Sequence, residues 1–81
     1  MFFTYVIESE LTGRFYIGQT NDLAARVLRH NKGRVPSTKS ERPWILIYYK
    51  GFETRSQAMR LEQRLKRFKK RVAVMKFFDE Q

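Results

Sequence analysis

Five side chains in this 81-residue sequence are of the types that could carry out the hydrolysis of a phosphodiester bond. The reaction must deprotonate a water, stabilise a charged, phosphorane-like transition state and neutralise a leaving oxyanion. An arginine fork matches phosphate oxygens, a tyrosine becomes a base where a cation lowers its pKa, and a glutamate oxygen suits Mg²⁺. The candidate catalytic residues are Tyr5, Tyr16, Arg26, His30 and Glu62.

The chemistry of these side chains predicts a role for each. Arg26 is expected to clamp the transition state, because its guanidinium is always charged. His30, one helical turn later, is expected either to orient Tyr16 or to relay the proton of that tyrosine. Tyr5 would bind the attacking water or the phosphate. Glu62 is expected to hold one Mg²⁺ or Mn²⁺ ion together with waters and substrate oxygens, and a single carboxylate binds such an ion weakly without substrate.

Each of these residues could also have an ordinary structural role. Two tyrosines on neighbouring strands commonly pack against each other, and an arginine and a histidine one turn apart commonly form a solvated helix flank. Glu62 lies four residues before Lys66, a spacing typical of an ion pair worth roughly 0.3 to 0.5 kcal/mol. The joint occurrence of all five residue types in this order favours an active site.

A hairpin is expected to carry the two tyrosines. Residues 3–8 and 14–19 are rich in aromatic and β-branched side chains, which predicts two antiparallel strands with a loop between them. If the loop centres between residues 10 and 11, Tyr5 lies directly across from Tyr16. Both tyrosines then share one face of the sheet.

A helix is expected to carry the arginine and the histidine. Capping side chains at residues 20–22 predict its start, and Gly33 is placed to end it in a left-handed conformation. At roughly 100° per residue, His30 borders the apolar side and Arg26 lies on the same flank, whereas Arg29 points away.

The second half of the chain completes the predicted fold. Residues 44–49 are apolar throughout, which predicts a strand covered on both faces and therefore the centre of the sheet. A capping-box pattern at residues 54–57 opens a second helix, which carries Glu62. Residues 72–78 form either a third short helix or a docking segment. The expected fold class is α+β, a three-stranded antiparallel sheet flanked by helices in the order β-β-α-β-α, with or without a final α, in one domain over residues 1–81.

The charge of the chain predicts a polyanionic partner. Seventeen Lys and Arg against eight Asp and Glu give a formal charge of +9, which favours nucleic acid. Ribosome-associated proteins and proteins that bind anionic membranes share this property, so charge alone leaves the partner open. The candidate nucleic-acid-binding residues lie in the loop after the first helix and on the second helix: Lys32, Arg34, Lys39, Arg42, Arg64 and Arg67.

The composition excludes several classes of site. The sequence has no cysteine, so disulfides and thiolate metal sites are impossible, and its single histidine excludes a poly-histidine metal cage. The N-terminal run MFFTYVIES lacks a basic region, and no apolar run approaches the ~20 residues of a transmembrane helix. We therefore expect a soluble, cytoplasmic protein without membrane contact.

The order of the candidate residues resembles that of a known family. Phe3-Thr4-Tyr5 is followed by Tyr16-Ile17-Gly18, then by Arg26 and His30 and by a later helical glutamate. This arrangement resembles the GIY-YIG endonuclease domain over nearly the whole chain. It is most similar to the small stand-alone subgroup, which shares the runs seen here as HNKG, TKSERPW and RLEQRLK. The nuclease domain of the bacterial excision-repair incision subunit also resembles it, although Gln19 stands where those subunits carry lysine.

The resemblance implies an activity. It implies a metal-dependent endonuclease with Tyr16 as general base, acting on nucleic acid, with DNA favoured over RNA and a place in repair or recombination. A catalytically silent nucleic-acid-binding module of the same fold remains the alternative hypothesis. Relatives obtain specificity from appended domains, so we expect a protein partner or self-association to supply targeting here.

Overall fold

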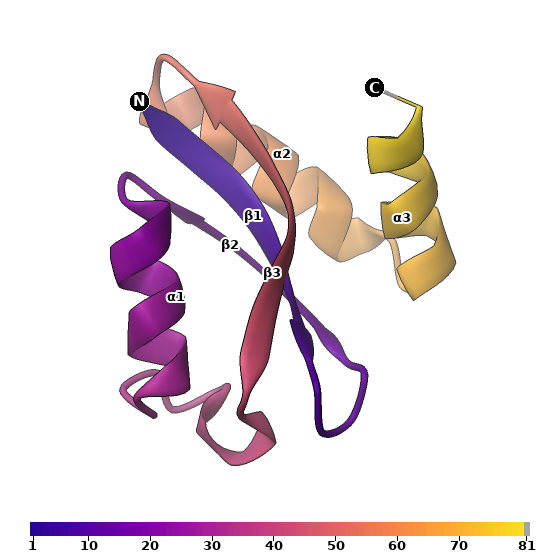
Figure 1. The fold of residues 1–81 in the computed structure, drawn as a ribbon. Coiled ribbons are helices and arrows are strands. Elements are labelled where there is room, and N and C mark those ends of the chain that lie inside the picture. The colour runs from indigo at the N-terminus through magenta and orange to yellow at the C-terminus, as the bar shows by residue number, and fades with distance from the viewer. Residues whose placement is uncertain (81) are drawn as a thin grey trace.

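The protein is a three-stranded antiparallel sheet with helices on both faces (Figure 1). The computed structural model describes residues 1–80. Its strands are β1 (Phe2–Ser9), β2 (Phe15–Thr20) and β3 (Trp44–Phe52), and its helices are α1 (Leu23–Asn31), α2 (Arg55–Arg67) and α3 (Arg71–Asp79), with a short 3-10 helix at Lys39–Glu41. The predicted α+β class and element order are confirmed, and the C-terminal segment is a helix. The predicted domain, residues 1–81, extends one residue beyond the described part.

The central strand is β1, which carries core side chains on both of its faces. Tyr5 and Ile7 pack with Trp44 on the side of the sheet that α1 covers. Val6 packs with Leu61 and other side chains of α2 and α3 on the opposite side. Because successive strand residues point to opposite faces, this one strand joins two apolar clusters.

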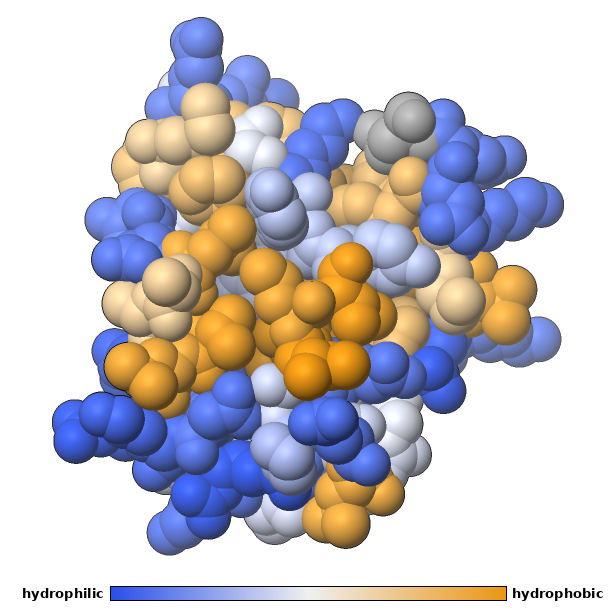
Figure 2. Space-filling view, in the orientation of Figure 1, coloured by the Kyte–Doolittle hydropathy of each residue, from blue (hydrophilic) through white to orange (hydrophobic). Residues whose placement is uncertain are grey.

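The prediction that residues 44–49 form the central strand is wrong. The sheet order is β2-β1-β3, so β3 lies at an edge and pairs with β1 alone among the described strands. Its apolar run is only partly covered: Ile45 is 42% exposed and Tyr49 is 58% exposed. Figure 2 shows apolar surface gathered over this strand. The apolar run therefore indicated a strand correctly, but the strand that is covered on both faces is β1.

The hairpin register differs from the predicted one by two residues. Tyr5 pairs with Gly18, and Tyr16 pairs with Ile7. The loop is centred farther along the chain because β1 extends to Ser9, whose side chain accepts hydrogen bonds from two backbone amides of the loop at 3.1 and 3.0 Å. A shift of two residues preserves the face to which each side chain points. The two tyrosines therefore still lie on the same face, as expected.

The predicted helix signals act as expected. The Asp22 side chain accepts a hydrogen bond from the backbone amide of Ala25 at 3.1 Å, and Gly33 adopts a left-handed conformation after α1 with φ of 73°. Thr54 and Gln57 form a reciprocal capping box at the start of α2. No helix within residues 1–80 is long and apolar enough to cross a membrane.

Gly18 provides the space that the Tyr5 side chain occupies. A Cβ atom at position 18 would lie 2.5 Å from the Tyr5 hydroxyl oxygen and 2.7 Å from Cζ of the same ring. The Tyr5 ring is buried and held by hydrogen bonding, so it has no room to move aside. The glycine of Tyr-Ile-Gly is thus required by close packing across the hairpin.

Replacing Gly18 by alanine should destabilise the fold through this contact. We expect Gly18→Ala to lower the free energy of unfolding by about 1–3 kcal/mol, the usual cost of overpacking a buried position. Gly51→Ala is a matched control, because its Cβ would first meet the end of the exposed Met1 side chain at 2.6 Å. Urea unfolding measures both changes, and equal stability of the two variants would contradict the packing role of Gly18.

Candidate active site

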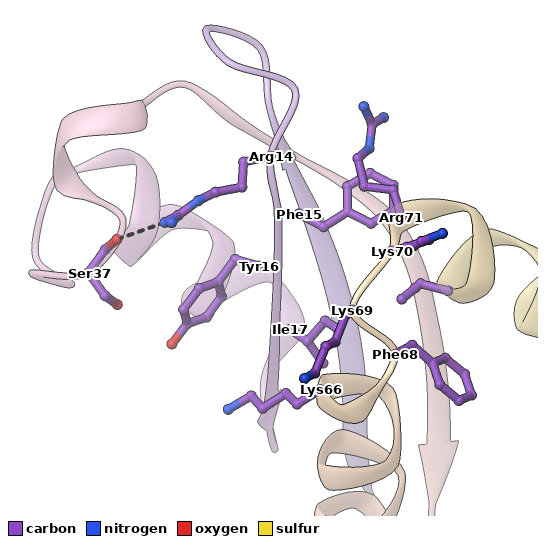
Figure 3. Close-up of a pocket in the computed structure, with 11 residues that line it drawn as sticks. Arg14, Phe15, Tyr16, Ile17, Ser37, Lys66, Phe68, Lys69, Lys70 and Arg71 are labelled. Atoms are coloured by element: carbon purple, nitrogen blue, oxygen red, sulfur yellow. Dashed lines mark hydrogen bonds between the residues drawn. The ribbon is translucent and has the colours of Figure 1, made fainter.

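The sheet and two helices bring the five candidate residues together around the Tyr5 side chain. Tyr5 comes from the central strand, Tyr16 from β2, Arg26 and His30 from α1, and Glu62 from α2. In Figure 3 the Tyr16 ring projects from β2 on the side opposite to Phe15 and Ile17. The predicted proximity of Tyr5, Tyr16, Arg26 and His30 is present in the fold, and the charge of Glu62 also acts on Tyr5.

Tyr5 and His30 form the buried centre of the group. The Tyr5 hydroxyl and His30 Nε2 are hydrogen-bonded at 2.9 Å, and both side chains are buried. The Tyr16 ring meets the His30 ring edge to face, with centroids 5.1 Å apart. His30 therefore hydrogen-bonds Tyr5, whereas its contact with Tyr16 is a ring contact.

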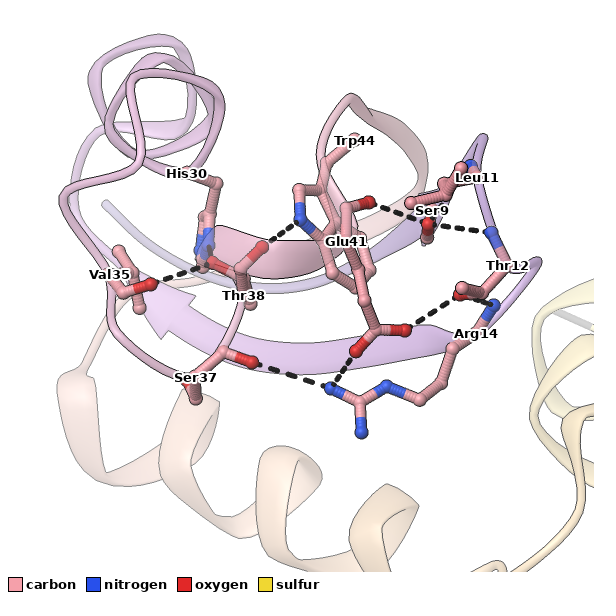
Figure 4. A network of polar contacts seen from close by, with 10 residues as sticks. All are labelled: Ser9, Leu11, Thr12, Arg14, His30, Val35, Ser37, Thr38, Glu41 and Trp44. Carbon is pink, nitrogen blue, oxygen red and sulfur yellow. Dashed lines mark hydrogen bonds and ion pairs between the residues drawn. The ribbon is translucent and has the colours of Figure 1, made fainter.

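The other nitrogen of His30 is hydrogen-bonded to the loop after α1 (Figure 4). His30 Nδ1 lies 2.8 Å from the Thr38 hydroxyl, which donates to the backbone carbonyl of Val35 at 3.3 Å. In the tautomer that leaves the Thr38 hydrogen for Val35, His30 Nδ1 donates to the Thr38 hydroxyl and Nε2 accepts a hydrogen bond from the Tyr5 hydroxyl. The result is a continuous chain of donors and acceptors from Tyr5 to the loop after α1.

Trp44 and Asn31 hold that loop in place. The indole N–H of Trp44 donates to the backbone carbonyl of Thr38 at 2.8 Å. The Asn31 side chain accepts from the Trp44 amide at 2.6 Å and donates to the Trp44 carbonyl at 2.9 Å. Trp44 is buried in the core, and sequence reasoning missed both Thr38 and Asn31. Their only sequence signal is membership of the HNKG and TKSERPW runs.

Glu41 ties the same loop to the hairpin (Figure 4). Its backbone carbonyl accepts from the Ser9 hydroxyl at 2.6 Å, and its carboxylate accepts from the Thr12 hydroxyl at 2.7 Å. Arg14 pairs with the second carboxylate oxygen at 2.7 Å. The residues that orient His30 are thereby connected to the strand pair that carries the tyrosines.

Burial sets the protonation of the central pair. It raises the pKa of Tyr5 above its usual value; Arg26, through charge and hydrogen bonding, lowers that pKa, and the charges of Tyr16 and Glu62 raise it. Burial, assisted by Arg26 and by another arginine on α1, lowers the pKa of His30 to about 4. At neutral pH the centre is therefore a neutral tyrosine bonded to a neutral histidine.

Arg26 and Glu62 approach this centre from two helices. Arg26 is half-buried and acts on the Tyr5 phenol, whereas Arg29 is exposed, as the helical spacing predicted. Glu62 is half-buried and pairs with Lys66 at 3.0 Å, which confirms the ion pair expected from their spacing.

The donor set near the site limits how a divalent cation could be held. Within residues 1–80 no group of three or more His, Asp or Glu side chains could hold a metal ion. Among the residues that the structure describes, Glu62 is a carboxylate whose charge acts on Tyr5, and its ion pair uses Oε2. One hard oxygen suits an ion that keeps most of its waters, as Mg²⁺ commonly does. The residues present thus fit a weakly held hydrated ion.

The six predicted nucleic-acid contacts lie in two groups. Lys32 and Arg34 are exposed after α1, and the Arg42 guanidinium donates to the Lys39 carbonyl at 2.8 Å in the same loop. On α2, Arg64 lies over the Phe77 ring at 5.2 Å from its centroid, and Arg67 is exposed at the end of the helix. Their contacts with nucleic acid remain predictions.

Comparisons with known proteins show which family, relatives and solved structure this chain is similar to. The GIY-YIG catalytic domain family model matches residues 1–76. A UPF0213 protein of Streptococcus pneumoniae is 39% identical over 79 residues, covering 96% of this chain and 78% of that protein. A UPF0213 protein of Staphylococcus haemolyticus is 34% identical over 67 residues, or 82% of this chain and 80% of the relative. The solution NMR structure of the UPF0213 protein BH0048 from Bacillus halodurans matches with a TM-score of 0.60 and 25% identity, over 100% of this chain and 86% of that one.

The lowered pKa of His30 predicts a loss of stability in mild acid. In the unfolded chain His30 has a pKa of about 6.5, so that state binds the proton first and gains population as pH falls from about 6.5 to about 4. The loss attributable to His30 should approach about 3 kcal/mol. Urea unfolding of the parent and of His30→Gln at pH 7 and pH 4.5 isolates the contribution of His30 to this loss of stability. Parallel pH dependences in the two proteins would show that His30 is not the titrating group.

Proposed function

This chain belongs to the family of GIY-YIG catalytic domains, and on that premise we propose that it is a metal-dependent endonuclease that hydrolyses phosphodiester bonds, with DNA as its substrate. The observation that carries the proposal is the gathering of Tyr16, Arg26 and Glu62 around the buried pair of Tyr5 and His30. A role in DNA repair or recombination belongs to the same proposal.

Tyr16 is the proposed general base. It is only half-buried and lies at the rim of a hollow, so water and substrate can reach its hydroxyl. Tyr5 is less suited to that role, because its pKa is raised and its hydroxyl is buried in a hydrogen bond with His30. A positioned base of this kind typically contributes ~10² to 10⁴ to the rate.

Arg26 is the proposed clamp on the phosphate, and Tyr5 and His30 position it. The Tyr5 hydroxyl is hydrogen-bonded to His30, and the lone pairs of its oxygen accept from the Arg26 guanidinium. Because Tyr5 is 1% exposed, it contacts neither bulk water nor a phosphate readily. We therefore assign Tyr5 and His30 as positioning residues that hold the guanidinium ready for the transition state.

Glu62 is the proposed ligand of one Mg²⁺ or Mn²⁺ ion. When bound, such an ion supplies a Lewis acid that offsets charge on the phosphate and on the leaving oxygen. The ion pair with Lys66 competes for the same carboxylate, which is the observation that favours the alternative of a silent nucleic-acid-binding module. The two candidate functions differ in a measurable property, namely metal-dependent cleavage.

Two substitutions should separate the base from the clamp. Tyr16→Phe retains the ring but removes the hydroxyl, so cleavage should fall ~10² to 10⁴-fold while binding is unchanged. Arg26→Ala should lower the rate and also weaken binding modestly, since its charge meets the phosphate in ground and transition states alike. The assay compares branched, single-stranded and duplex DNA and RNA, with Mg²⁺ or with a chelator. A folded Tyr16→Phe protein that cuts at the parent rate would exclude Tyr16 as base, and no cleavage by the parent on any substrate would favour the silent module.

Metal binding by the free protein should be weak and should tighten with substrate. One carboxylate is a poor cage for a divalent ion, so phosphate oxygens must complete the coordination. Titration with Mn²⁺, followed by its magnetic resonance signal, should show this tightening when an uncleavable oligonucleotide is added. Glu62→Gln should remove the effect, whereas Glu53→Gln, an exposed acid in the turn before α2, should preserve it. A tight, stoichiometric site in the free parent would contradict the single-ligand assignment.

A further inference from the structure

A hollow of about 460 Å³ lies along β2 and reaches the turn between α2 and α3 (Figure 3). Tyr16 is part of its wall, so the hollow adjoins the candidate active site. Its lining includes no acidic residue. We call it the basic groove, after the cations that surround it: Arg14, Lys66, Lys69, Lys70 and Arg71.

Three of these cations are already paired with acids. Arg14 pairs with Glu41, Lys66 with Glu62, and Arg71 with Glu8 at 2.6 Å. Their charges are therefore largely offset, although each guanidinium or ammonium retains further donors.

Lys69 and Lys70 are different. Both are exposed, and within the described residues neither has an ion pair. They follow each other in the short turn between α2 and α3, and Figure 3 shows both beside the hollow. Two uncompensated ammonium groups beside a hollow without acids make a local field that attracts an anion.

The remaining lining is apolar and partly aromatic. Phe15, Ile17 and Phe68 contribute to it, and the Arg71 guanidinium lies 4.5 Å from the centroid of the Phe15 ring. A purely ionic site for a small anion would not need such a floor. Cations above aromatic and aliphatic side chains are typical of sites that hold a nucleic-acid strand, whose phosphates meet the cations while sugars or bases meet the floor.

The size of the hollow limits the ligand. Its volume lies in the range of pockets for small organic molecules, so the hollow itself accommodates about one nucleotide unit of a strand. Because Tyr16 borders it, that unit is a near neighbour of the bond that is cut.

We propose that the basic groove binds the sugar-phosphate backbone of the cleaved strand on one side of the scissile bond, with Lys69 and Lys70 holding a flanking phosphate. This assignment rests on the proposed function for the position of the scissile bond. Lys69 and Lys70 were not among the sequence-based candidates. Arg64, a sequence-based candidate on α2, lies over Phe77 and outside the groove lining.

Charge reversal of the two lysines tests the groove. Binding of a fluorescent single-stranded oligonucleotide to the full chain is measured by anisotropy in a chelator, so that no cleavage occurs. Lys69→Glu with Lys70→Glu should weaken binding at least ~10-fold at low salt. The slope of log K against log salt should fall by about 1.4, as expected for two lost contacts to a single strand. Lys69→Gln with Lys70→Gln, which removes charge without repulsion, should lower the slope in the same direction.

A second pair of substitutions controls for net charge. Arg60→Glu with Lys76→Glu changes the formal charge equally, from exposed positions outside the groove lining. This control variant should bind the oligonucleotide much more tightly than the variant with both lysines reversed, and it should keep the salt slope of the parent. Circular dichroism checks that every variant is folded. If the groove variants and the control bind alike, the groove is not the strand site.

Competition with inorganic phosphate distinguishes a bound strand from a bound free anion. Unlabelled oligonucleotide should displace the fluorescent oligonucleotide, whereas inorganic phosphate at the same concentration of phosphate groups should not. Equal displacement by the two competitors would show that the groove binds a free anion, and would overturn the proposal.

Cleavage assays on the same variants distinguish failure of the groove from failure of the proposed activity. If the parent cuts DNA and the folded lysine variants bind and cut as it does, the groove fails while the proposed activity stands. If the parent never cuts but only the lysine variants lose binding, the proposed activity fails while the groove stands.

Discussion

The buried hydrogen bond between Tyr5 and His30 connects the central strand of the sheet to α1, and most of the site depends on it. It spans 2.9 Å between two side chains that are almost fully excluded from solvent. Gly18 makes room for the tyrosine, and Thr38 completes the hydrogen bonding of the histidine. Buried polar groups are costly unless satisfied, so these supporting residues are needed for the fold as much as for any reaction.

That constraint also sets the charges available to the site. Because burial keeps both partners neutral, the fixed charges around the phenol are those of Arg26 and Glu62. In a region of low dielectric these charges act more strongly than they would on an open surface. Within the described residues no buried side-chain nitrogen or oxygen lacks a hydrogen-bond partner, so the neutral centre is fully satisfied. A rigid neutral centre with charges at its margin is a preorganised arrangement.

The sequence predicted the elements and the grouping of the candidate residues, since strand patterns, caps and helical spacing are local signals. It misjudged what depends on distant contacts. The hairpin register was wrong by two residues because Ser9 closes the loop through its side chain, which the strand pattern does not reveal. The apolar run of β3 was placed at the centre because partial exposure of Ile45 and Tyr49 is decided by the placement of the helices. Thr38 was missed because its partner, His30, is eight residues away across an irregular loop.

The two edges of the sheet serve different purposes, and this matters for protein engineering. The β2 edge carries Tyr16 and the groove, whereas β3, which presents an apolar surface, lies at the opposite edge of the sheet, beyond β1. An exposed edge can accept an additional strand through its free backbone groups. A fused targeting module that adds such a strand beside β3 would extend the sheet away from the catalytic candidates. The same module attached beside β2 would obstruct them.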